Sequence, residues 1–241
     1  MMLKSMTRKR LLLCSVSLLF TFTAQASSLE EVEKVIRDSF NEYNSIRSDL
    51  RIEASIPMQD IQIPVSGEGK MEYMKGDDGG KFRQAFTLSA PEPIEMEVDM
   101  TVISDGRETV IISEMMGIRN VMRQNAELSQ GTVPPGGEDL LSALKRETDL
   151  LLMDDSEIDG HAVYVIEAKP KVKADTQFSS ALIHIDKKLG VTRLITMHEE
   201  GKLKSIGNIR FYNIELNPSL SPENFRLDTE SPPSPATPSI P

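Results

Sequence analysis

The sequence lacks tryptophan, has one cysteine among its 241 residues, and has few aromatic residues of any kind. A core built around large aromatic side chains is therefore excluded. Cys14 lies inside an N-terminal apolar run, so the rest of the chain holds no thiol. That excludes a disulfide framework and a cysteine nucleophile in the body of the protein. The chain is long enough to rely on a hydrophobic core instead.

Positive charge is also scarce, with 27 basic side chains against 37 acidic ones. A strongly acidic chain repels phosphate backbones, so nucleic acid is excluded as a partner class. It is also not drawn to anionic lipid headgroups by charge. Such a surface keeps a protein soluble and apart from its own copies, and we expect a monomer.

The longest apolar run spans residues 11–22, well short of the roughly 20 residues that a membrane-spanning helix needs. It follows a basic cluster at residues 8–10 and precedes the small-residue site Ala24-Gln25-Ala26. This order predicts a secretory signal peptide over residues 1–26. Cleavage there removes four basic residues and no acidic one, which lowers the formal net charge from −10 to −14. Two alternatives are an uncleaved anchor, for which the run is short, and a lipoprotein signal, for which Cys14 is misplaced.

Apolar residues then recur at spacings of three and four, which predicts an amphipathic helix over Leu29–Tyr43. After it, the period changes to two. The clearest example is 94–102, where apolar side chains alternate with Glu95, Glu97, Asp99 and Thr101. Strands are predicted over residues 50–56, 69–75, 81–88, 94–102, 109–113, 161–168, 180–186, 191–199 and 204–216.

Residues 138–146 read as a short mid-chain helix, and 115–137 as irregular. The predicted fold is mainly β with α. It is an open, half-closed antiparallel barrel whose concave face is covered by the N-terminal helix and the mid-chain helix. We expect one domain over 27–230 and a disordered proline-rich tail over 231–241.

Several short motifs resemble a known family. They are Gly69-Lys70-Met71, Ser104-Asp105-Gly106-Arg107, Ile185-Asp186 with Gly190, and the run 211–217 with Leu220 and Phe225 after it. Together with the element order, they resemble the outer-membrane lipoprotein carrier (LolA-like) superfamily of the bacterial periplasm. That superfamily also includes lipoprotein-receptor and sigma-regulatory sensor domains. The resemblance implies a periplasmic protein that shields acyl chains or lipoproteins in an unclosed barrel. It also implies membrane-anchored donor or acceptor partners.

The sequence departs from the carrier pattern at one informative place. The carriers have an Arg-Pro pair at the end of the second strand, and its arginine latches the lid of the cavity. Here the equivalent stretch is Lys75-Gly76, and a lysine cannot reproduce the planar, forked contact of a guanidinium. Arg83 lies one hairpin arm later and is not a substitute. The chain therefore resembles a divergent relative, and lipoprotein sorting itself does not follow.

Apolar side chains on one face of the predicted strands are the candidate lining of a ligand cavity. The alternative is that they are ordinary core residues beneath a helix. Flexible methionines suit a cavity that must also release its cargo. The candidates are Leu50, Ile52, Ile56, Phe82, Phe86, Ile94, Met96, Val98, Met100 and Val102.

No motif in the chain points to catalysis. His161, His184 and His198 have no metal-ligand spacing, and the acidic stretch 154–159 lacks the positions of a calcium loop. We therefore expect no enzyme activity, no metal and no cofactor. Two functions remain open: a carrier of lipid acyl chains, and a non-enzymatic envelope sensor or interaction domain of the same fold that binds a protein partner.

Overall fold

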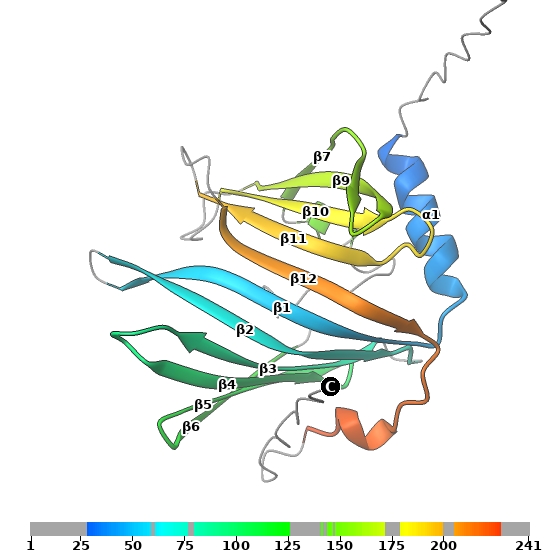
Figure 1. Cartoon of the computed structure of the whole chain (residues 1–241). Helices are drawn as coiled ribbons and strands as arrows, with labels where there is room; N and C mark the ends of the chain where they lie inside the picture. The colour runs from blue at the N-terminus through cyan, green and yellow to red at the C-terminus, as the bar shows by residue number, and fades with distance from the viewer. Residues whose placement is uncertain are drawn as a thin grey trace, which may run out of the picture.

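The computed structural model describes residues 28–58, 61–76, 80–125, 141, 144–146, 148–171, 179–199 and 205–227. The predicted signal peptide and proline-rich tail lie outside these residues. Helix α1 (Leu29–Asn41) comes first and the short 3-10 helix η2 (Pro222–Phe225) comes last (Figure 1). The strands between them are β1 (Ser45–Met58), β2 (Ile61–Met74), β3 (Lys81–Ala90), β4 (Met96–Ser104), β5 (Glu108–Met115), β6 (Ile118–Asn125), β7 (Thr148–Leu152), β8 (Ser156–Ile158), β9 (His161–Pro170), β10 (Ser180–Asp186), β11 (Thr192–His198) and β12 (Ser205–Leu216).

Helix α1 begins with a capping box. The Ser28 hydroxyl accepts the Glu31 N–H, and the Glu31 carboxylate accepts the Ser28 N–H. The helix was predicted to reach Tyr43, but it ends at Asn41 with Glu42 as its C-cap. Tyr43 leaves the helical path and is buried, and its hydroxyl donates to the Leu189 carbonyl at 2.8 Å. A long-range contact therefore decides the orientation of this residue.

All the strands join one antiparallel sheet, in the order β6-β5-β4-β3-β2-β1-β12-β11-β10-β9-β7, with β8 paired to β9. Strands β1 and β12 lie side by side in the middle and join two antiparallel meanders. Strands β6 and β7 end the order, so the sheet is not closed among the described residues. The predicted class, a mainly β, open antiparallel barrel with helices, is confirmed.

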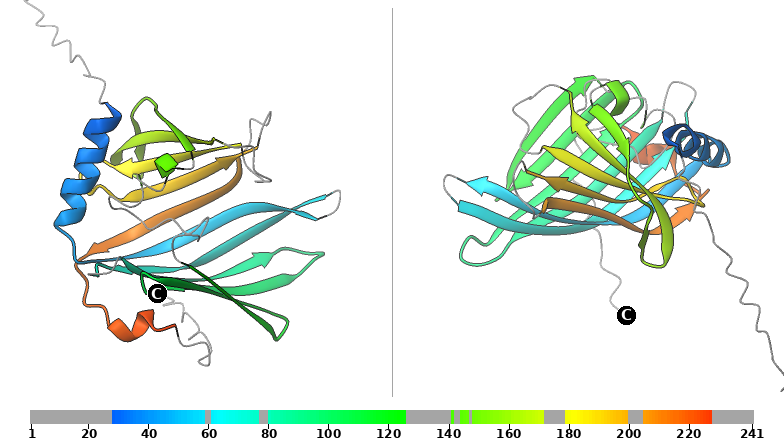
Figure 2. Two further views of the ribbon diagram at one scale, coloured as in Figure 1. Left: turned by 180° about the vertical axis from the view of Figure 1, so that it is seen from behind. Right: turned by 90° about the horizontal axis from the view of Figure 1, so that it is seen from above.

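The sheet is strongly bent (Figure 2). Seen from above, β1 and β12 lie at its base, β4 to β6 rise on one side, and β9 and β10 rise on the other. Cross-strand pairs show that one face carries mainly apolar side chains, and we call it the concave face. The opposite, convex face carries charged side chains over β1 and β2, among them Arg47, Arg51, Glu68 and Glu72.

The helical cover lies over one arm of this trough. Val32 and Ile36 of α1 pack with the helical residue Leu141 against concave-face side chains of β9 and β10, including Ile166 and Ile183. The two predicted helices are therefore present, Leu141 and residues 144–146 being the described part of the second. Their contacts cover the β9–β10 arm rather than the whole concave face.

Some predicted boundaries were wrong. Residues 115–137 were predicted to be irregular, but Ile118–Asn125 forms β6. Adjacent Val121 and Met122 interrupt the period of two, and pairing with β5 imposes the extended conformation. The short strands β7 and β8 were missed because each is too brief for a period to appear. The strand predicted from Ile94 begins at Met96, since Ile94 lies in a turn in which its N–H donates to the Pro91 carbonyl.

In the structure, residues of the motifs that resemble the family form turns and connect neighbouring strands. The Asp105 carboxylate accepts the N–H groups of Arg107 and Glu108, which closes the β4–β5 hairpin. Asn213 and Asn217 both adopt positive φ angles, of 50° and 55°, which asparagine tolerates well. The Asn217 side chain also accepts the Asn44 N–H at 2.7 Å and so ties the end of β12 to the start of β1.

Two glycines on the concave side of β2 let the backbones of β2 and β3 lie close together. A β-carbon on Gly69 would lie 2.1 Å from the Ala85 carbonyl oxygen, and one on Gly67 would lie 2.3 Å from the Thr87 carbonyl oxygen. Both distances are far inside van der Waals contact with main-chain atoms. These positions therefore require glycine.

We predict that Gly69→Ala lowers the free energy of unfolding by about 1–3 kcal/mol, because the new methyl group forces β2 away from β3. Urea denaturation followed by far-UV circular dichroism measures the change. Lys70→Ala, one residue along on the exposed convex side, is the matched control and should change stability by less than about 0.5 kcal/mol. Equal stabilities of the two variants would contradict this account.

Candidate binding site: the concave apolar face

The candidate lining residues lie on one face of the sheet. Antiparallel partners point to the same side, and the register joins them across the strands in rows. One row runs from Ile52 through Gly67 and Leu88 to Val98, and the next from Leu50 through Gly69 and Phe86 to Met100. Nine of the ten predicted residues share the concave face in this way, and Ile94 lies in the turn that enters β4.

The two ends of this face differ. Near the C-terminal end of α1, Leu50, Phe82 and Val102 are buried in a cluster with Tyr43 and Tyr73. These three side chains are packed as ordinary core residues, since the protein's own side chains surround them.

At the end of the face distal to α1, the described part of the chain covers the apolar side chains only in part. Ile56 is exposed, and six other predicted residues are only partly buried. Those six are Ile52, Phe86, Ile94, Met96, Val98 and Met100. The accessible part of the apolar face is therefore its distal half.

Further residues of this face were not among the predicted lining residues. Ile195 of β11 and Ile209 of β12 pair across the base of the trough, and Ile183 of β10 pairs with Ile195. Beyond β4, the register adds Ile111, Met115, Ile118 and Met122. The even spacing of Ile118 and Met122 was the available signal for β6.

Aromatic and cationic contacts hold the C-terminal part of α1 against the buried cluster that contains Tyr73. The rings of Phe40 and Tyr73 lie 5.2 Å apart, and the Lys75 ammonium lies 5.8 Å from the centre of the Phe40 ring. Lys75 thus contacts the helix. It does so as a point charge over a ring, without the forked hydrogen bonds of a guanidinium.

A buried ion pair supports the hairpin on which α1 rests. Asp186 is 1% exposed and accepts Arg193 Nε at 2.6 Å. Its other oxygen accepts the N–H groups of Lys188 and Leu189 at 2.8 and 2.9 Å. Burial raises the pKa of Asp186, but the hydrogen bonds from Arg193 and the two N–H groups outweigh it, so the net pKa is lowered. The turn that Asp186 shapes carries the Leu189 carbonyl that binds Tyr43.

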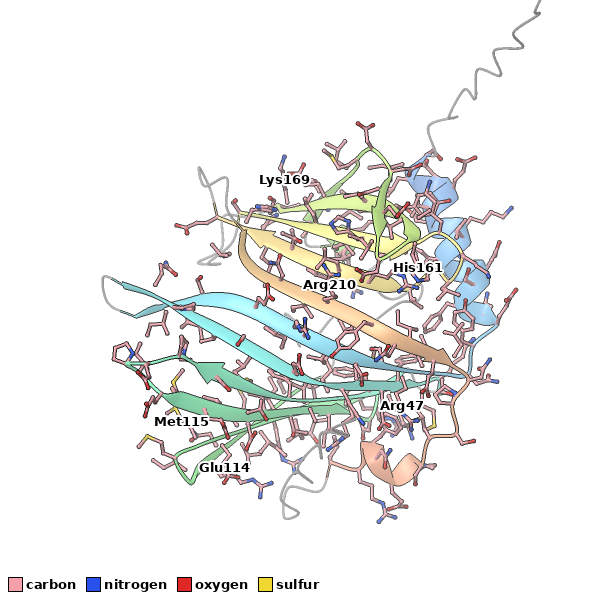
Figure 3. All side chains as sticks on the ribbon, in the orientation of Figure 1. Arg47, Glu114, Met115, His161, Lys169 and Arg210 are labelled. Carbon is pink, nitrogen blue, oxygen red and sulfur yellow. The ribbon has the colours of Figure 1, made fainter. Side chains whose placement is uncertain are left out.

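The histidines lie apart from the concave apolar face. His161 Nδ1 lies 3.4 Å from Asp186 Oδ2 and 3.0 Å from Arg193 Nη2, at the same end of the sheet as α1 (Figure 3). His184 pairs with Val165 and Leu194, and burial lowers its pKa. Across the part of the chain that the structure describes, no three His, Cys, Asp or Glu side chains gather closely enough to hold a metal ion. The described helices include none with the length and apolarity to cross a bilayer.

The convex face has a shallow polar depression over β1, β2 and β3. Its walls include the exposed ion pair of Arg51 with Glu68, at 2.6 Å. Its other lining residues are Glu53, Ser66, Gly67, Thr87 and Ser89. The depression is open and polar, so it does not correspond to the apolar face on the other side of the sheet.

No family model matches the sequence, and no curated protein matches it. Solved structures are similar to the chain in fold. A LolA superfamily protein from Nitrosomonas europaea is 10% identical, with a TM-score of 0.35, over 83% of this chain and 98% of that one. The lipoprotein LppX of Mycobacterium tuberculosis is 15% identical, with a TM-score of 0.43, over 80% and 99%.

MucB in the MucA/MucB complex of Pseudomonas aeruginosa is also similar in fold. It is 16% identical, with a TM-score of 0.43, over 82% of this chain but 60% of the other. The chain therefore spans about three fifths of MucB. The superfamily that the sequence resembles is among these structural neighbours, and each likeness concerns the fold alone.

We predict that Asp186→Asn destabilises the protein by about 3 kcal/mol at pH 7, because Arg193 keeps its buried charge without a countercharge. The folded-state pKa of Asp186 is lowered, so its contribution is complete above the unfolded pKa of about 3.9 and disappears as the pH falls through the folded value. The difference between wild type and variant should therefore shrink in acid, and urea unfolding over a pH series measures it.

Asp159→Asn is the matched control for this test. Asp159 forms an exposed pair with Arg210 at 2.8 Å, and such pairs contribute at most about 1 kcal/mol. A penalty for Asp186→Asn that is no larger than the control's, or that is constant between pH 7 and pH 3, would show that the ion pair does not support the hairpin.

Proposed function

We propose that this protein binds lipid acyl chains on the distal half of its concave face and acts as a periplasmic carrier. The observation that supports the proposal is a pair of adjacent rows that carry partly buried apolar side chains, Ile52 and Val98 in one and Phe86 and Met100 in the other, on the concave face of an unclosed sheet. An acyl chain lying there would gain about 0.8 kcal/mol for each methylene removed from water.

The arrangement suits reversible binding. Met96 and Met100 are unbranched and can adjust to chains of different shape. No cation lies among the ten candidate residues, so affinity would depend on chain length rather than on a headgroup charge. The buried cluster at the α1 end would limit how far an acyl chain can enter.

The same buried cluster favours a second candidate. If the concave face serves mainly to seat the protein's own helices, the domain would act as an envelope sensor or interaction domain that binds a protein partner. The filling of the α1 end by Tyr43, Tyr73 and Phe82 is the observation behind this candidate. Native mass spectrometry of the protein purified from cells separates the two: co-purified lipid supports the carrier, and a lipid-free mass with a bound protein supports the sensor.

The absence of tryptophan offers a direct test of acyl-chain binding, because an introduced tryptophan is the only one in the chain. We predict that Met100→Trp shows a saturable blue shift of its emission as palmitate is added, since the ring then loses contact with water. Glu97→Trp, on the same strand but on the convex side, should show none. Unchanged emission of Met100→Trp throughout the titration would contradict the proposed site.

A charged variant tests the same site by affinity. Val98→Lys places an ammonium group in the proposed lipid path, so we expect it to weaken binding of a fluorescent fatty acid by about tenfold or more. Glu97→Lys makes a larger change of charge, of two units against one, but on the convex side, and should leave the affinity within about twofold. Equal affinities of these two variants would count against binding on the concave face.

A further inference from the structure

Strand β6 has features that the proposed acyl-chain site does not use. It ends the strand order and pairs only with β5 among the described residues. Ile118 and Met122 face the concave side and are 64% and 55% exposed, and Val121 on the other side is exposed as well. Figure 3 shows Met115, in the same hairpin, at the end of the molecule away from α1. A free edge flanked by exposed apolar side chains is a template for another strand.

The charges of β6 differ from those of the protein as a whole. The strand contains Arg119 and Arg123 and no acidic residue, whereas the whole chain has a formal net charge of −10. Both arginines oppose convex-side positions of β5, namely Glu114 and Val110. The Arg123–Glu108 pair, at 3.1 Å, is exposed on both sides, so a second carboxylate can share this guanidinium at little cost.

The other end of the sheet provides a contrast. Strand β7 also pairs with one neighbour, β9, and Leu151 on it is 56% exposed. Its five residues include Asp149 and no basic side chain. Apolar exposure is thus common to both ends of the sheet, while positive charge belongs to β6.

We propose that β6 binds an extended acidic peptide segment of a partner protein, which adds to the sheet as a further strand. In this arrangement, main-chain hydrogen bonds to the β6 edge supply affinity. Alternate apolar side chains of the peptide pack on Ile118 and Met122, and its intervening carboxylates lie beside Arg119 and Arg123.

Charge and hydrogen bonding disfavour two other occupants. A second copy paired antiparallel about Val121 would set Arg119 of each molecule opposite Arg123 of the other, and like charges in that position are destabilising. A bilayer would leave the N–H and C=O groups of the edge without partners in hydrocarbon. An acidic strand satisfies both the charges and the backbone groups.

The test uses the full chain and a fluorescent peptide of the same length as β6, with alternating valine and glutamate. We expect saturable binding by anisotropy and slower hydrogen exchange of the β6 amides. A valine–lysine peptide, and the acidic peptide with alternate N-methyl groups, should bind at least about tenfold more weakly. Equal binding of either control peptide, or no saturable binding of the acidic one, would overturn the proposal.

Variants locate the binding edge. Met122→Glu removes an apolar contact and adds a carboxylate that repels the peptide, so it should weaken binding of the acidic peptide by about tenfold, while Leu151→Glu on β7 should leave it within about twofold. Both side chains are exposed, so both variants should keep the wild-type unfolding midpoint. Equal losses in the two variants would overturn the assignment to β6. A dimer that forms without peptide and is lost in Met122→Glu would also overturn it, and so would binding to phosphatidylcholine vesicles that Met122→Glu abolishes. Palmitate binding through Met100→Trp is measured separately and does not depend on this result.

Discussion

A wide antiparallel sheet with one apolar face has to bury that face against something. This sheet does so by bending, and the bend brings the apolar side chains of β1 to β5 and β9 to β12 onto the inside of a trough. Because the sheet does not close among the described residues, the trough has to be covered by other parts of the molecule or by a ligand. The way in which the apolar face is covered differs between the two ends of the trough.

At one end, the protein supplies the cover itself. Helix α1 packs over β9 and β10, and Phe40 and Tyr43 reach the neighbouring cluster. The hairpin beneath the helix is held by the buried Asp186–Arg193 pair, with backbone N–H groups satisfying the second carboxylate oxygen. This polar support explains how a turn can be rigid enough to position Leu189 and Gly190 against the helix. At the other end, none of the described residues covers the half-buried methionine and aliphatic side chains in this way, and the proposed acyl-chain site lies among them.

Sequence patterns and the structure agree best where a single strand face carries the signal. The alternation in residues 94–102 placed Met96, Val98, Met100 and Val102 on one side, and the register confirms it. Prediction was weakest where pairing with a neighbour imposes the conformation, as in β6, or where an element is very short, as in β7 and β8. Tyr43 shows a third limit, since the contact that draws it out of the helix comes from a residue 146 positions away.

The sequence by itself determined the mainly β class, the alternation of apolar and polar faces, and the turn chemistry at Asp105, because these depend on neighbours a few residues apart. It also determined the acidic balance and the lack of metal-ligand spacing among the histidines. Only the tertiary structure decided which apolar residues are sealed and which are reachable. Leu50 and Met100 read alike in the sequence. Leu50 is buried in the cluster with Tyr43, whereas Met100, three strands away in the same row, is only partly buried, because burial depends on which parts of the folded chain lie over each position.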